Sequence, residues 1–135
     1  MNWNCEGHII TDDIINYVKN ILKVDFPDDF LSAIKKYDGG YPNPNVITIN
    51  GSYEVVNNLV SFCKDDESFI VNIFKETEYL QDLKLIPIAE DTFGNLFCYD
   101  FMDDKSKIVF WEHENFNTKK FICDSFNELI QMLHN

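Results

Sequence analysis

The chain contains no arginine, and lysine supplies all eleven of its strongly basic residues. Arginine is the side chain that grips phosphates and carboxylates with two parallel hydrogen bonds, so this route to phosphate recognition is absent. With 23 acidic residues the formal net charge is −12, and such a field repels a nucleic-acid backbone. The composition argues against nucleic-acid binding. It leaves two interpretations open: attraction of a basic protein partner, or an acidic surface that serves solubility alone.

Cysteine is sparse and widely spaced, with four residues at positions 5, 63, 98 and 123 and no C-x-x-C pair. This pattern lacks the density of a disulfide framework. Cys98 and Cys123 lie in apolar runs, where a free thiol behaves as a small buried hydrophobic group. The histidines His8, His113 and His134 lack the ligand spacing of a zinc site, and no EF-hand spacing occurs. We therefore expect neither a metal nor another cofactor.

Long apolar runs are also missing, since none approaches the roughly 18 residues that a membrane span needs. The first residues, 1–6, carry neither the basic nor the apolar part of a signal peptide, so we expect a cytoplasmic protein without membrane contact. Apolar residues nevertheless make up 45% of the chain, including twelve Phe and six Tyr, which excludes disorder. A length of 135 residues fits a single domain, residues 1–135, with a substantial core.

Helix signals occur in four places. Thr11 is a good N-cap, and two aspartates and an apolar stripe follow it. A second helix is predicted to open at Pro27 and to stop at Gly39-Gly40. A third is predicted around residues 69–74. The last follows Ser125, which forms a capping box with the glutamate three residues later.

Strand signals fill the middle of the chain. Asn50-Gly51 between apolar runs predicts a hairpin over residues 46–56. Further strands are predicted at Leu85–Ala89, Leu96–Phe101, Lys107–Trp111 and Lys119–Cys123. Helices first, then an antiparallel meander, then a closing helix predict an α+β fold rather than a wound parallel sheet. The C-terminal helix is expected to pack on one face of the antiparallel β-sheet, with the N-terminal helices beside it.

Four segments, in the same order along the chain as in a known family, carry a resemblance to it. They are the helix Phe26–Gly40 (Phe-Pro start, Gly-Gly end), the hairpin Leu85–Leu96 (Leu-Ile-Pro-Ile-Ala-x-Asp-x-x-Gly-Asn-Leu), the strand Ile108–Glu114 (ending Trp-x-His-Glu) and the start of the last helix, Ser125–Leu129 (Ser-Phe-x-Glu-Leu). Together they resemble the SUKH superfamily, which includes bacterial immunity proteins and a yeast cell-wall assembly regulator.

The resemblance implies an α+β protein that is not an enzyme and that binds and neutralises a partner. In bacteria that partner is usually a protein toxin, often a nuclease. An alternative implied by the yeast relatives is a cytoplasmic scaffold or regulatory module that binds several proteins. The identity of the partner and its binding residues do not follow from the resemblance, because both vary across the family.

The turn of the central hairpin holds two adjacent acids, Glu90 and Asp91. An aspartate followed by Gly94-Asn95 is typical of a turn in which the carboxylate accepts bonds from nearby backbone N–H groups. We therefore expect Asp91 to hold the turn, while Glu90 points outward and contacts a basic partner. Both belong to the predicted partner-binding set.

Other acids cluster at 65–67, at Asp103 and Asp104 in a predicted turn, and at Glu112 and Glu114 around His113. In a strand, Glu112 and Glu114 would share one face and His113 the other, which opposes a catalytic triad. No nucleophile elbow, zinc-protease motif or P-loop occurs. We therefore predict that Asp103, Asp104, Glu112 and Glu114 contribute to the acidic partner-binding surface and not to catalysis.

Overall fold

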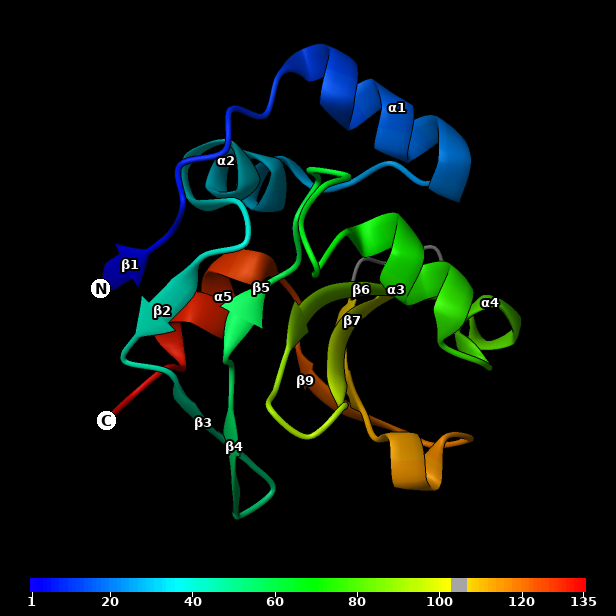
Figure 1. Cartoon of the computed structure of the whole chain (residues 1–135). Coiled ribbons are helices and arrows are strands. Elements are labelled where there is room, and N and C mark those ends of the chain that lie inside the picture. Colours follow the sequence, from blue (N-terminus) through cyan, green and yellow to red (C-terminus); the bar gives the residue numbers. More distant parts are fainter. Residues whose placement is uncertain (103–106) are drawn as a thin grey trace.

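The computed structural model describes residues 1–102 and 107–135 (Figure 1). Over these residues the elements in chain order are β1 (Asn2–Asn4), α1 (Asp12–Leu22), α2 (Asp28–Tyr37), β2 (Tyr41–Asn43), β3 (Val46–Ile49), β4 (Ser52–Val55), β5 (Asn58–Leu59), α3 (Ile70–Glu76), α4 (Leu80–Leu83), β6 (Leu85–Glu90), β7 (Leu96–Asp100), β8 (Lys107–Trp111), the 3-10 helix η1 (His113–Asn115), β9 (Lys119–Cys123) and α5 (Phe126–Gln131). The predicted α+β class is confirmed.

Helix α1 begins where its capping residue predicts. The Thr11 hydroxyl oxygen accepts a hydrogen bond from the backbone N–H of Ile14 at 3.2 Å. The helix ends at Lys23, which takes a left-handed φ of 59° and donates its N–H to the carbonyl of Lys19. Ile15, Val18 and Leu22 form its buried face. The other face stays open to solvent, which matters for the groove described below.

Helix α2 begins one residue later than the sequence predicts. Pro27 is the N-cap and not the first helical residue, because its ψ of 148° is extended. At the other end, Gly39 adopts a φ of +66°, which glycine takes without steric cost, and the N–H of Gly40 donates to the carbonyl of Tyr37 at 2.7 Å. Asp38 is the C-cap. This turn brings Asp38 and Gly39 to the candidate site.

Five antiparallel strands form the main sheet in the order β5-β6-β7-β8-β9. The meander β6–β9 is confirmed, whereas β5 was not predicted because two residues are too few to show a strand pattern. The pairing of β6 with β7 shifts register between Pro87 and Ala89. A proline is tolerated at such a bulge, where the regular ladder of hydrogen bonds is already interrupted.

Successive residues of the strands enter two separate hydrophobic cores. On β7, Phe97 and Tyr99 belong to the larger core, while Leu96 and Cys98 belong to the smaller one. The larger core also includes Phe126 of α5, which confirms that the closing helix packs on one sheet face. The smaller core includes Leu80 at the start of α4. The sheet is therefore covered on both faces, and β6, β7 and β8 read as continuous apolar runs.

In the part of the chain that the structure describes, two short strand pairs lie outside the main sheet. The hairpin β3–β4 turns at Asn50 and Gly51, both with positive φ, as the sequence predicts. Strand β1 pairs with β2, and the ring of Trp3 stacks on that of Tyr37 with centroids 5.0 Å apart. This pairing holds the N-terminal segment against the end of α2, so that the residues between β1 and α1 lie beside Asp38.

The predicted burial of Cys98 and Cys123 is confirmed, and burial raises the pKa of both thiols. No described helix combines the length and the apolar character that crossing a membrane would require.

Candidate functional site

A strongly acidic cavity of about 340 Å³ lies where the N-terminal segment, the end of α2, the start of β2 and the loop between β5 and α3 meet. We call it the acidic pocket. Its lining residues are Glu6, His8, Asp38, Gly39, Tyr41, Asp65, Asp66, Glu67 and Ser68. Five of the nine carry a carboxyl group, one is histidine and none is lysine. Such a lining attracts a cationic group.

Asp38 forms the buried base of the acidic pocket, with a relative exposure of 3%. One carboxyl oxygen accepts from the backbone N–H of Phe62 at 2.7 Å, and the other accepts from the Ser61 hydroxyl at 2.5 Å. The Ser61 oxygen in turn accepts from the N–H of Cys63 at 2.9 Å. Burial raises the pKa of the Asp38 carboxyl, although these hydrogen bonds oppose the shift. Asp38 therefore fixes the start of the loop between β5 and α3, which we call the acidic loop because it carries the acids at 65–67.

His8 is the one group of the pocket lining that can carry a positive charge. Its Nε2 lies 3.0 Å from a carboxyl oxygen of Asp66 and 3.5 Å from one of Glu6. The hydrogen bond with Asp66 raises the pKa of His8, with the charges of nearby carboxylates adding to the effect. Asp66 also accepts from the backbone N–H of Ser68 at 2.8 Å, which orders the loop. The exposed acids beside it, Asp65 and Glu67, are thus presented from a fixed backbone.

The same trio could also supply ligands to a cation. The nearest donor atoms of Glu6, His8 and Asp66 all lie within 4.8 Å of one another. Imidazole nitrogen with carboxylate oxygen suits a divalent transition metal. Sequence spacing could not show this grouping, because 58 residues separate His8 from Asp66.

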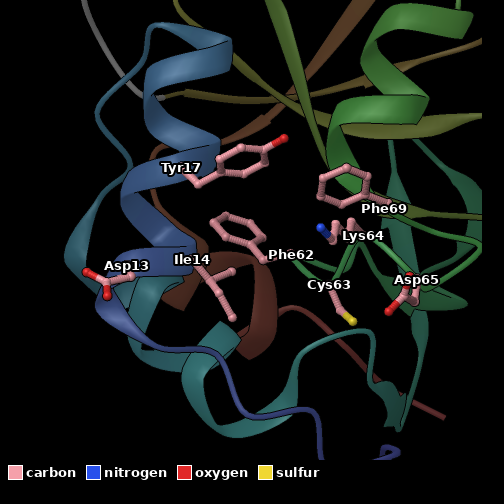
Figure 2. A pocket seen from close by; sticks show the side chains of 8 residues that line it. All are labelled: Asp13, Ile14, Tyr17, Phe62, Cys63, Lys64, Asp65 and Phe69. Atoms are coloured by element: carbon pink, nitrogen blue, oxygen red, sulfur yellow. The ribbon is translucent and has the colours of Figure 1, made fainter.

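An apolar groove of about 390 Å³ adjoins the acidic pocket, and Asp65 lines both. Figure 2 shows this groove, with Ile14 and Tyr17 of α1 on one side, Phe69 on the other and Phe62 between them. Its remaining lining residues are Asp13, Cys63, Lys64 and Asp65. Tyr17 is 55% exposed, so the groove presents aromatic surface to a partner.

Comparison with protein families matches residues 12–130 to the SUKH_6 model, which is described as SMI1-KNR4 cell-wall. The chain belongs to this SUKH family. The match runs from the first residue of α1 to within the last helix, so it includes Asp38, the acidic loop and the groove. Glu6 and His8 precede it. Comparison with curated proteins finds no match.

In this SUKH chain, the prediction for Asp91 as a turn residue is confirmed. One of its carboxyl oxygens accepts from the N–H groups of Phe93 and Asn95, both at 2.8 Å, and the other accepts from the Asn95 side chain at 2.8 Å. Gly94 supplies the positive φ of +87° that the turn needs. Asp91 is only 7% exposed, so its carboxylate is committed to the turn.

The expected outward orientation of Glu90 is wrong. Its Oε2 accepts from the side-chain amide of Asn58 at 2.9 Å and from the Ser68 hydroxyl at 2.8 Å, and the residue is half-buried. The cause is strand β5, in which Asn58 pairs directly with Glu90. Because β5 was not predicted, nothing in the sequence indicated that Glu90 has a neighbour on that side.

The predicted end of the strand at Trp111 is confirmed, so residues 112–114 do not alternate between two faces as they would in a strand. The Trp111 indole N–H donates to the carbonyl of Phe116 at 2.8 Å, which closes the chain into a short 3-10 turn. Glu112 pairs with Lys120 at 3.0 Å, whereas the side chain of Glu114 is 86% exposed. His113 faces the hairpin turn, with Nδ1 2.8 Å from the Asn95 amide oxygen.

None of the four described residues of the predicted partner-binding set, Glu90, Asp91, Glu112 and Glu114, lines the acidic pocket. Asp103 and Asp104 lie outside the described residues, and their role stays a prediction. The signal that did point to the pocket was the acidic run at 65–67. Asp38 carried no such signal, since in sequence it is an ordinary residue at the end of a helix.

Replacing Asp91 with alanine is expected to lower the free energy of unfolding by about 2 kcal/mol, because its carboxylate satisfies three donors of the turn. Urea unfolding measures the change, and Thr92→Ala at the exposed neighbouring position is the control. Equal stability of the two variants would show that the Asp91 hydrogen bonds do not hold the turn.

Proposed function

We propose that this SUKH-family protein is an immunity protein that binds a basic protein toxin, such as a nuclease, and neutralises it by covering its functional surface. The acidic pocket carries the proposal, because five carboxyl groups line one cavity without a lysine among them. The net charge of −12 and the family membership support it. The mechanism is occlusion, with no bond made or broken.

The physical case rests on complementary charge. A nuclease needs a basic surface to hold its phosphate backbone, and an acidic partner competes for that surface. Opposite fields also steer the two proteins together and raise the association rate at low salt. The acidic pocket is suited to this because Asp38 and the His8–Asp66 pair hold the loop that presents Asp65 and Glu67. A preformed surface loses little entropy on binding.

The direct experiment uses the polypeptide encoded beside this gene. Co-expression of the chain should restore growth to cells that make this polypeptide, and the purified pair should form an equimolar complex. The association rate should fall steeply as salt increases. A neighbouring gene without a toxin domain, or a toxin whose action the chain leaves unchanged, would contradict the proposal.

Charge reversal tests whether the acidic pocket is the face that binds. The double variant Asp65→Lys, Glu67→Lys is expected to lower the association rate constant about tenfold at low salt while leaving the free energy of unfolding nearly unchanged, since both side chains are exposed. The matched control is Glu78→Lys, Asp82→Lys, two exposed acids outside the acidic pocket and the groove. Equal rates for the two double variants would place the binding face elsewhere.

The second candidate is a scaffold or regulatory module that binds several proteins. The description of the matching family as SMI1-KNR4 cell-wall favours it. Both functions use the same fold, so the number of partners separates them. Affinity capture from the native host should recover one stoichiometric toxin for an immunity protein, and a mixed set of proteins for a scaffold.

A further inference from the structure

The groove between α1 and the loop before α3 has the features of an anchor site. Ile14, Tyr17, Phe62 and Phe69 supply its apolar surface, and the buried Phe62 forms its floor (Figure 2). A cavity of about 390 Å³ accommodates one large apolar side chain with room to spare. Tyr17 is exposed on the rim, and tyrosine is among the residues that most often dominate binding energy at interfaces.

The acidic pocket begins where the groove ends, since Asp65 lines both cavities. A lysine or arginine side chain entering the acidic pocket would form charge-assisted hydrogen bonds with Asp65 and Glu67. An anionic or nucleic-acid segment would be repelled there. Charge complementarity therefore restricts the occupant of the whole surface to a cationic one.

Lys64 helps to determine which end of a bound segment enters which cavity. It lines the groove but not the acidic pocket, so the one lysine of this region stands on the apolar side of Asp65. The groove also contains two carboxylates, Asp13 and Asp65, whereas five carboxylates and no lysine line the acidic pocket. A cationic side chain of a partner is therefore favoured in the acidic pocket over the groove. The reverse arrangement, with the apolar side chain in the acidic pocket, would desolvate carboxylates without compensation.

We propose that the two cavities form one docking surface for a protein segment in which a large apolar side chain is followed, a few residues away, by lysine or arginine. The apolar side chain fills the groove, and the cationic one enters the acidic pocket. This inference rests on the proposed function, since it names the kind of segment that a basic toxin would present to this face.

The test uses synthetic peptides and the full chain. Acetylated peptide amides with leucine, one to three glycines and a terminal arginine are titrated into labelled protein, and backbone amide shifts are recorded by NMR. Each residue of the spacer extends the reach by about 3.5 Å. We expect saturable shifts in residues 62–69 and in α1, with dissociation constants of about 1 mM. Matched peptides replace arginine with glutamine, or leucine with glycine, and both should bind about tenfold more weakly.

Variants assign each half of the peptide to its cavity. In Tyr17→Ala, the leucine peptide should bind no more tightly than the peptide with glycine in its place. In Glu67→Gln, the arginine peptide should bind no more tightly than the glutamine peptide. Lys64→Gln should strengthen binding of the arginine peptide about threefold, since it removes a like charge. The matched controls are Tyr53→Ala and Glu78→Gln, at exposed positions outside both cavities, and they should leave binding unchanged.

Three results would overturn the inference: shifts that fall outside residues 62–69 and α1, equal binding of the arginine and glutamine peptides, or equal binding with and without leucine. Its failure is separable from that of the proposed function. Peptides that do not bind here, together with a toxin that Tyr17→Ala still neutralises, would reject the docking surface alone. Peptides that bind as expected, with no toxin neutralised, would reject the immunity function alone.

Discussion

Replacing Phe30 with alanine is expected to lower the free energy of unfolding by about 4 kcal/mol. Phe30 is fully buried, and its ring packs against aromatic rings from three other parts of the chain. The centroid distances are 6.1 Å to Phe62, 5.6 Å to Tyr99 and 5.4 Å to Phe126. These neighbours come from the loop before α3, from β7 and from α5. One truncation therefore leaves a cavity where a helix, the sheet and the closing helix meet.

Chemical denaturation with a two-state fit measures this change. Phe93→Ala is the matched control, because it removes the same side chain from a position that is 74% exposed, and its effect should stay below about 0.5 kcal/mol. Phe30→Leu should fall between the two, since it keeps much of the buried volume. If Phe30→Ala and Phe93→Ala unfold at the same denaturant concentration, the aromatic cluster does not hold these elements together.

Replacing Asp38 with alanine is expected to lower the free energy of unfolding by about 3 kcal/mol, the second largest of the expected effects. The change leaves the backbone N–H of Phe62 and the hydroxyl of Ser61 without their acceptor in a buried site, and each orphaned group costs about 1–3 kcal/mol. Asp38→Asn should cost less than half as much. The amide oxygen can still accept from Phe62, and the amide NH₂ group can donate to the Ser61 oxygen. Equal loss in the two variants would show that shape, and not hydrogen bonding, matters at this position.

Aspartate and asparagine at position 38 also differ in how the free energy of unfolding depends on pH. Burial raises the pKa of Asp38 in the folded protein above its value in the unfolded chain, so the folded state holds the proton more tightly. The stabilisation from this carboxyl is complete below the unfolded pKa of about 3.9 and declines as pH rises through the folded value. Asparagine has no such titration. The stability of the wild type relative to Asp38→Asn should therefore fall as pH rises through this window, and a constant difference would contradict the assignment.

Sequence reasoning succeeded where structure depends on neighbours along the chain. The capping of α1 by Thr11 joins residues three apart, and that of α5 by Ser125 does the same. The turn at Asn50-Gly51 requires only positive φ at two adjacent residues. The carboxylate of Asp91 bonds donors two and four residues ahead. In each case a short segment contains both partners, so its residue types are sufficient to predict the contact.

Sequence reasoning failed where the partner is distant. Glu90 accepts a hydrogen bond from the side chain of Asn58, 32 residues earlier in the sequence. Asn58 lies on β5, a strand too short to be recognised from the sequence. The acidic pocket depends on a pairing between β1 and β2 that brings His8 to Asp66. No local pattern encodes these distances, because they follow from how the elements pack. Only the acidic run at 65–67 marked this part of the molecule in advance.

The position of β9 as the last strand of the main sheet has a consequence for self-association. Among the described residues β9 pairs with β8 alone, so its outer backbone groups could template a strand from another molecule. Lys119 and Lys120 lie on this strand, where they pair with Asp100 and Glu112. Lysines on the open edge hinder strand addition, because an added strand would have to desolvate their charged groups. In a chain so rich in acids, these two scarce cations protect the sheet edge against aggregation.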